Sequence, residues 1–177
     1  GSGLVGSEMC IRDRLAKAQY MHYQPAETNT SIREGWFYRD DDNQRSRSAN
    51  DVFDMYERAV GGNSIFLLNI PPNREGRFSQ VDVDVLADAG KRIRETYTTN
   101  LLKGSNLPAA VTDGEITTFI EAAGPVEIVL PKAVTLNRFM IQEPVSERGE
   151  RIEGLRLEAM VDGRWVTVAE CTNVGFK

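Results

Sequence analysis

The residues best suited to chemistry lie in the stretch Pro25–Tyr38, which reads Pro-Ala-Glu-Thr-Asn-Thr-Ser-Ile-Arg-Glu-Gly-Trp-Phe-Tyr. Glu27 could act as a general acid and base if apolar or acidic surroundings raised its pKa. Trp36 begins a run of three aromatic residues, and such rings pack well against the apolar face of a sugar. The alternative for Glu27 is a surface carboxylate that pairs with Arg33. The alternative for the aromatic run is burial in a core.

Composition limits the kinds of partner. Of the 177 residues, 41% are apolar and 27% are charged, which is typical of a soluble globular protein. The net charge of −5 counts against a nucleic-acid partner, because binding to phosphates needs a basic face. The sequence also contains no apolar run long enough to predict a membrane span.

The first residues of the chain match a sequencing artefact, which indicates that they are not native protein. Residues 4–14, Leu-Val-Gly-Ser-Glu-Met-Cys-Ile-Arg-Asp-Arg, match a translated sequencing adapter, so residues 1–14 are set apart and native sequence is expected to begin near Leu15. The alternative is a short natural segment. On the adapter interpretation Cys10 is foreign, which leaves Cys171 as the single native cysteine and excludes an internal disulfide.

Three other polar features of the sequence are candidate sites. His22 is the only histidine, and a lone histidine is more often structural than a ligand. Asp40-Asp41-Asp42 is interpreted as a solvated loop, because the glycine and closing glutamate of a calcium loop are missing. Asn69 is expected to bond backbone groups where a strand turns into a loop, with substrate contact as the alternative.

Helix and strand signals follow the first stretch, which is itself predicted to be a loop. Ser48 opens a helix with capping chemistry, and Gly61–Gly62 ends it. Its apolar face comprises Val52, Tyr56, Ala59 and Val60. Ile65–Leu68 is a continuous apolar run, which predicts a strand covered on both faces and ended by Pro71-Pro72. Leu15–Gln24 has weak helical spacing.

A second helix is predicted to begin at a cap formed by Ser79 with Asp82. Its apolar stripe comprises Val83, Leu86, Gly90, Ile93 and Tyr97. Helix, buried strand and helix in succession form the repeat of a β/α barrel. Such a barrel takes about 250 residues, so this part of the chain predicts a piece of one.

After the linker at residues 98–106 the apolar period changes to two. Alternation predicts strands in three segments: Val126–Leu130, Phe139–Ile141 and Leu155–Val161. Asp162-Gly163 is expected to form a type I′ turn with positive φ at both residues, leading into a strand at Trp165–Ala169. Leu155, Leu157 and Val161 should lie buried together on one face. The pattern predicts an antiparallel β-sandwich.

The motif Pro-Ala-Glu-x-x-x-Ser-Ile-Arg-x-Gly-Trp-Phe-Tyr, together with Ser64–Pro72, resembles the C-terminal part of the catalytic domain of family 29 glycoside hydrolases, the α-L-fucosidases. The later segments Asn100–Gly104, Asn137–Phe139 and Asp162–Trp165 resemble their discoidin-like, galactose-binding sandwich. The resemblance implies an α/β plus all-β protein. Residues 15–99 would end a (β/α)8-type barrel, and residues 100–177 would form a truncated sandwich.

The resemblance also implies a function. The family retains configuration with two carboxyl groups, and its acid/base glutamate falls on Glu27. The nucleophilic aspartate would lie upstream, so this chain alone is expected to be inactive. Trp36 would contact the terminal fucose of an oligosaccharide or glycoconjugate. The resemblance implies no cofactor and no metal. It also implies a periplasmic or extracellular protein. Glu34 and Arg39 depart from the proline and histidine common in relatives, which bears on substrate preference.

A second hypothesis stays open. The chain could be a carbohydrate-binding or structural β-sandwich module that carries a non-catalytic remnant of a barrel. For the sandwich, a packing role is favoured over sugar binding. Recovering the gene upstream of Leu15 would separate the two hypotheses, because the first requires a nucleophilic aspartate there.

Overall fold

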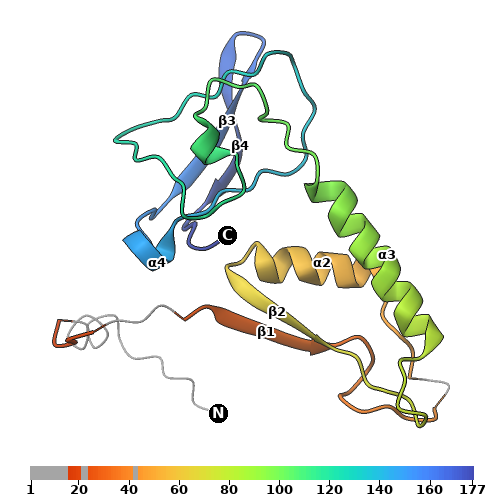
Figure 1. Ribbon diagram of the computed structural model, residues 1–177. Coiled ribbons are helices and arrows are strands. Elements are labelled where there is room, and N and C mark those ends of the chain that lie inside the picture. Colours follow the sequence, from red (N-terminus) through yellow and green to blue (C-terminus); the bar gives the residue numbers. More distant parts are fainter. Residues whose placement is uncertain (1–15, 21–23, 42–43) are drawn as a thin grey trace.

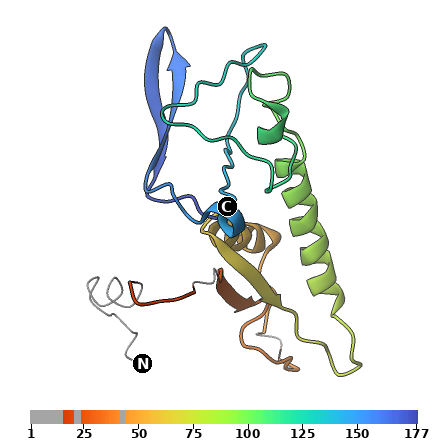
Figure 2. The ribbon, with the colours of Figure 1, turned by 60° about the vertical axis from the view of Figure 1, so that its left-hand side comes forward.

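The computed structural model describes residues 16–20, 24–41 and 44–177. A part with two strands and two long helices precedes a second part that contains an antiparallel hairpin, and the second of these helices, α3 (Gln80–Tyr97), leads from the first part to the second in both Figures 1 and 2. The adapter segment and His22 lie outside the described residues. Of Leu15–Gln24, residues 16–20 form a turn rather than a helix.

Two parallel strands form the first sheet. β1 (Ala26–Ser31) pairs with β2 (Ser64–Asn69) in a register that runs from Ala26 opposite Ser64 to Ser31 opposite Asn69. The prediction that this part of the motif is a loop is therefore wrong. Its polar sequence has no apolar period, but the β-branched Thr28 and Thr30 suit an extended backbone, and β2 supplies the pairing that local sequence could not reveal.

The helix α2 (Ala49–Val60) connects the two strands and begins as predicted. The Ser48 hydroxyl accepts the Asp51 backbone N–H at 3.1 Å, and the Asp51 carboxylate accepts the Ser48 N–H at 3.1 Å, which completes a capping box. Gly61 follows the last turn and donates its N–H to Glu57 O at 2.8 Å.

The second long helix, α3 (Gln80–Tyr97), follows a loop after β2. Ser79 is its N-cap residue but makes no side-chain capping bond, and Asp82 is buried and bonded to another part of the chain. The predicted N-cap position is therefore confirmed, but the predicted capping interaction of Ser79 with Asp82 is wrong. The predicted stripe is confirmed in part, because Leu86 packs against the core and Gly90 and Ile93 are half-buried, whereas Val83 and Tyr97 are exposed and Ala89 and Val85 complete the inner face instead.

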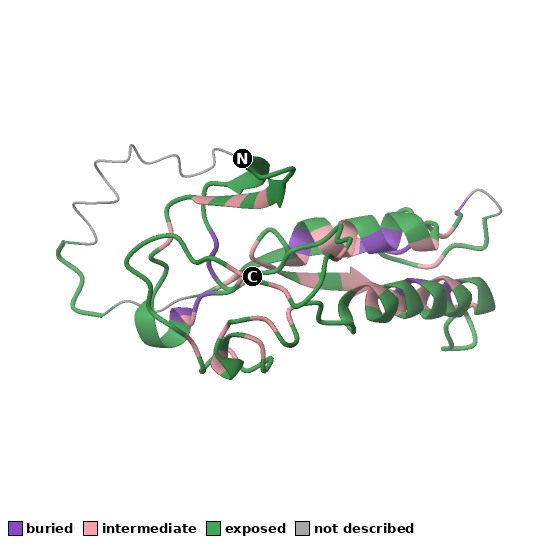
Figure 3. Ribbon diagram, turned by 90° about the horizontal axis from the view of Figure 1, so that it is seen from above, coloured by how far each residue is buried: buried purple, intermediate pink, exposed green. Residues whose placement is uncertain are grey.

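The core lies between the sheet and the helices. Ile32, Val52 and Ala89 form its centre, with Leu68 and Ile70 packed against it, and Figure 3 shows the buried residues of both helices. Ile65 and Leu67 alternate with Leu68 along β2 and are exposed. The prediction that both faces of β2 are covered is thus wrong for this structure, because the helices cover one face alone.

The second part of the chain contains η1 (Ala109–Val111), α4 (Val145–Arg148), β3 (Leu155–Val161) and β4 (Arg164–Cys171). β3 and β4 form an antiparallel hairpin, and its turn residues Asp162 and Gly163 have φ angles of 49° and 78°. The predicted turn geometry is confirmed. Leu155 and Leu157 are half-buried on one face as expected, but Val161 is exposed near the tip of the hairpin.

The predicted strands Val126–Leu130 and Phe139–Ile141 do not form, since the structure assigns no strand there. The side chain of a single asparagine instead bonds two backbone groups of the first segment. Asn106 donates its amide N–H to Glu127 O at 3.0 Å, and its amide oxygen accepts the Val129 N–H at 2.8 Å. Alternation alone predicted strands, but a strand also needs a neighbouring backbone to pair with.

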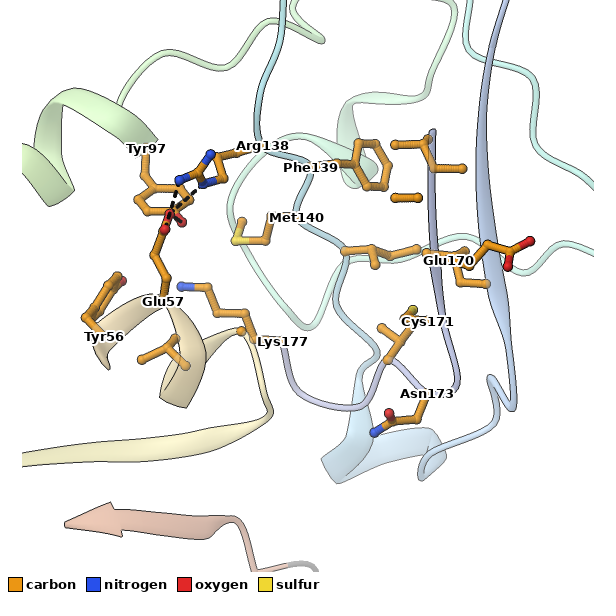
Figure 4. A pocket seen from close by; sticks show the side chains of 17 residues that line it. Tyr56, Glu57, Tyr97, Arg138, Phe139, Met140, Glu170, Cys171, Asn173 and Lys177 are labelled. Carbon is orange, nitrogen blue, oxygen red and sulfur yellow. Dashed lines mark hydrogen bonds and ion pairs between the residues drawn. The ribbon is translucent and has the colours of Figure 1, made fainter. Parts of the chain in front are cut away.

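A charged cluster joins the two parts of the chain. Arg138 donates to the Glu57 carboxylate at 2.6 and 2.9 Å, and the Tyr97 hydroxyl donates to the same carboxylate at 2.7 Å. Burial and the bond to Glu57 raise the pKa of Tyr97 to about 12. The cluster borders a cavity of about 280 Å³ that is also lined by Leu157 and by Phe139 (Figure 4).

Acid should weaken this contact. Hydrogen bonds from Arg138 hold the pKa of Glu57 below its ordinary value of 4.5. The stability that a depressed carboxyl pKa contributes is present above the unfolded-state pKa and is lost as the pH falls through the folded-state pKa. We therefore expect the urea midpoint of the protein to fall between about pH 5 and about pH 3, and to fall less in Glu57→Gln.

A matched control is available for this experiment. Glu121→Gln alters an exposed carboxylate that lies 3.7 Å from Arg148, and it should keep the pH dependence of the wild type because exposed pairs contribute little. If Glu57→Gln and the wild type lose stability equally on acidification, Glu57 does not contribute in this way.

Candidate functional site

The carboxyl ends of β1 and β2 meet at one edge of the sheet, where Ser31 lies opposite Asn69. The Asn69 amide donates to the Ser31 hydroxyl at 3.1 Å and to the Trp36 carbonyl at 2.9 Å. The predicted role of Asn69 in bonding the strand-to-loop turn is confirmed. Its bond also brings Trp36 to this edge, where β/α barrels place their active sites.

The segment after β1, residues 32–47, is named the carboxyl-edge loop, and a buried ion pair holds its base. Arg33 Nε donates to the two Asp82 carboxylate oxygens at 2.8 and 3.1 Å, and Asp82 is 0% exposed. The Ser46 hydroxyl also bonds to Asp82. This ion pair joins the loop to α3, and the sequence analysis missed it. The sequence signal for this ion pair was Asp82 itself, an acidic residue one position before Val83, where the predicted apolar stripe of the helix begins.

Two aromatic side chains of the carboxyl-edge loop are open to solvent. Trp36 is 47% exposed and Phe37 is 83% exposed, whereas Tyr38 is half-buried with the Arg33 guanidinium 5.6 Å from its ring centre. The alternative of an aromatic run buried in a core therefore fails for Trp36 and Phe37. Their surfaces are available to a ligand.

The structure separates the two predicted site residues. Glu27 is exposed near the amino-terminal end of β1, opposite Ile65, and it lies four positions before Ser31. At about 3.3 Å per residue this places it about 13 Å from the carboxyl edge. The geometry brings Trp36, Ser31 and Asn69 together and leaves Glu27 apart. Its alternative pairing with Arg33 is not supported either, because Arg33 bonds to Asp82.

Neither a metal centre nor a membrane-spanning helix is found in the described parts of the chain. Within residues 16–20, 24–41 and 44–177, no three or more His, Cys, Asp and Glu side chains gather closely enough to hold a metal ion. Across the same residues no helix combines the length and hydropathy needed to cross a bilayer. Asp42 of the acidic triplet lies outside them.

Comparisons with known proteins show which family this chain resembles. Residues 6–96 match the family profile described as Alpha-L-fucosidase. The curated Alpha-L-fucosidase 1 of Arabidopsis thaliana is 29% identical over 86% of this chain and 34% of its own length. The chain spans about a third of the length of the curated relatives it matches.

Solved structures described as fucosidases also resemble this chain. One from Bacteroides thetaiotaomicron has a TM-score of 0.76 and 33% identity over 95% of this chain and 42% of its own. A Ruminococcus gnavus GH29 fucosidase in complex with fucose has a TM-score of 0.71 and 25% identity over 85% of this chain and 34% of its own. Because the family profile covers 91 of the 177 residues, and these structures share the fold, the chain belongs to the α-L-fucosidase family of glycoside hydrolase family 29.

Proposed function

We propose that the protein containing this chain is an exo-acting, retaining α-L-fucosidase that releases terminal fucose from oligosaccharides or glycoconjugates. The observation that carries the proposal is the exposed Trp36 at the carboxyl edge of a parallel β/α unit in a chain of this family. An aromatic ring at this edge suits the apolar face and methyl group of fucose.

The proposed architecture assigns residues 15–99 to the end of a (β/α)8-type barrel. The parallel pairing of β1 with β2 and the helices on one face support this arrangement. The exposed Ile65 and Leu67 also support it, because side chains on the inner face of a barrel pack against the other strands. Residues 100–177 are assigned to a discoidin-like sandwich on the strength of the β3–β4 hairpin.

The proposed reaction needs two carboxyl groups about 5–5.5 Å apart. One carboxylate attacks the anomeric carbon while the other group protonates the departing oxygen, and water activated by the second group then hydrolyses the glycosyl-enzyme. The family resemblance places the nucleophile upstream of residue 15. We therefore propose that the 177-residue chain alone is inactive.

Hydrolysis of aryl glycosides tests the proposed function. The full-length protein should release the phenol from an aryl α-L-fucoside and leave aryl β-galactoside and α-glucoside intact, and proton NMR should detect α-fucose as the first product. The 177-residue chain should release none. A full-length protein that binds fucosylated glycans without hydrolysing them would instead favour the second hypothesis, a non-catalytic binding module.

The acid/base role of Glu27 stays a prediction of the family resemblance, and the position of Glu27 in β1 predicts the opposite result for its replacement. A general acid must reach the departing oxygen, and Glu27 lies at the end of the strand opposite to Trp36. We therefore expect Glu27→Gln in the full-length protein to keep kcat for an aryl α-L-fucoside within about threefold of the wild-type value.

The acid/base role predicts a different pattern for the same variant. It predicts a loss of about 100-fold or more for substrates with poor leaving groups, a smaller loss for activated aryl fucosides, and rescue of the latter by azide. Glu95→Gln, which alters an exposed carboxylate 3.8 Å from Lys91 on α3, serves as the control. Selective loss with azide rescue would establish Glu27 as the acid/base after all.

A further inference from the structure

One buried amide organises the backbone of the carboxyl-edge loop. Gln44 is 3% exposed, and its amide nitrogen donates to the carbonyls of Glu34 and Phe37 at 2.9 and 2.8 Å. Its amide oxygen accepts the Arg39 backbone N–H at 2.8 Å. Both amide N–H donors and the acceptor oxygen are thus engaged by residues 34–39, which wrap around this side chain.

Gln44 is itself firmly held. Its backbone N–H donates to Asp41 O at 2.8 Å, and its carbonyl accepts from Arg33 Nη1 at 3.0 Å. Arg33 in turn is bonded to the fully buried Asp82 of α3. The support for residues 34–39 therefore runs continuously from the helix through Arg33 to the amide of Gln44.

Trp36 and Phe37 lie in a segment whose backbone carbonyls are held by hydrogen bonds from Asn69 and Gln44. The Trp36 carbonyl is bonded by Asn69, and the carbonyls on either side of it, at Glu34 and Phe37, are bonded by Gln44. Gly35 makes the turn between them with φ of +81°. The backbone is fixed while the rings of Trp36 and Phe37 face solvent. A surface held in its binding geometry loses less conformational entropy when a ligand binds.

We propose that Gln44 is a positioning residue, which holds Trp36 and Phe37 in the geometry that receives the sugar. The proposal rests on the proposed function, because it assigns the aromatic pair to fucose and to the group linked to it. Gln44 itself contacts no substrate. Its effect on binding should pass through the aromatic pair alone.

Replacement of Gln44 by methionine tests this role in the full-length protein. Methionine keeps the length of the side chain but removes three hydrogen bonds. We expect the KM for an aryl α-L-fucoside to rise about tenfold while kcat stays within about threefold, since binding geometry and not the reacting groups is altered. Gln80→Met is the matched control, because Gln80 is exposed and its amide bonds to Asp84 on the same helix. It should leave both constants unchanged.

A double-mutant cycle separates positioning from a general structural effect. In a Trp36→Ala/Phe37→Ala background, Gln44→Met should raise KM less than about twofold, because residues that act as one unit are not additive. If Gln44→Met does not fold, Gly35→Ala gives a second route to the same loop. A Cβ at Gly35 meets nothing within 4 Å, but φ of +81° strains it, so KM should rise several-fold without loss of the fold.

The outcomes distinguish this inference from the proposed function. A wild-type protein without fucosidase activity contradicts the proposed function and this inference with it. An active wild type whose KM changes less than about twofold in both Gln44→Met and Gly35→Ala contradicts the positioning role alone. An equal rise in KM with and without the aromatic pair Trp36 and Phe37 also contradicts it.

Discussion

Replacement of Asp82 by alanine is expected to destabilise the protein by about 3–5 kcal/mol, which is the largest effect on stability that the structure predicts. Asp82 is 0% exposed and accepts two bonds from Arg33 Nε at 2.8 and 3.1 Å. The variant would leave the buried guanidinium without its carboxylate. Urea unfolding of the full-length protein measures the loss.

Two further variants separate this effect from a general effect of substitution in α3. Asp84→Ala changes an exposed carboxylate that accepts from Gln80 at 2.8 Å, and it should cost less than about 0.5 kcal/mol. The double variant Arg33→Met with Asp82→Leu removes both charges and should recover part of the loss. Equal stability of Asp82→Ala and Asp84→Ala would show that the buried ion pair has no net role.

Replacement of Trp36 by alanine is expected to lower kcat/KM for an aryl α-L-fucoside by about 100-fold, which corresponds to about 2.7 kcal/mol of lost binding. The indole is 47% exposed at the carboxyl edge, so it can cover the apolar face of the sugar. Trp36→Phe should retain most of the activity, because a smaller ring still provides an apolar surface.

The second tryptophan supplies the matched control for this prediction. Trp165 is 53% exposed on β4, so Trp165→Ala removes an equally exposed indole from the other part of the chain. Its kcat/KM should stay within about twofold of the wild-type value. A Trp36→Ala variant that keeps wild-type kcat/KM would remove Trp36 from the substrate site.

Local signals predicted the elements that local bonds define. The helix that begins after Ser48 and the turn at Asp162-Gly163 appear where the sequence indicated, because a capping box and a type I′ turn are built by neighbouring residues. The role of Asn69 was predictable only in part, since its amide does bond a strand-to-loop segment, but that segment is the loop after β1 and the bonded Trp36 carbonyl lies 33 residues earlier in the chain.

Elements that depend on distant partners were missed. β1 pairs with a strand 38 residues later in the chain, so its polar sequence gave no indication of a strand. Asp82 was mistaken for a cap because its partner Arg33 lies 49 residues away. The alternating segment Val126–Leu130 showed the opposite error, since the backbone bond from Asn106 N–H to Val129 O at 3.2 Å does not extend into a ladder between strands.

The candidate site shows the same division. The family motif identified Glu27 and Trp36 as residues of interest, but it could not reveal that they lie at opposite ends of one strand. The sequence did not predict the burial of Gln44, because glutamine in a polar loop is ordinarily exposed. Its importance follows from three bonds that form only when the loop closes around it.

A crystal structure of the full-length protein with fucose bound is the most direct test of a fucosidase site at this edge. We predict that fucose lies at the carboxyl ends of β1 and β2, with the Trp36 indole about 4 Å from its apolar atoms and an upstream carboxylate beside the anomeric carbon. Fucose bound at the amino-terminal end of β1 beside Glu27, or bound only to residues 100–177, would contradict this assignment.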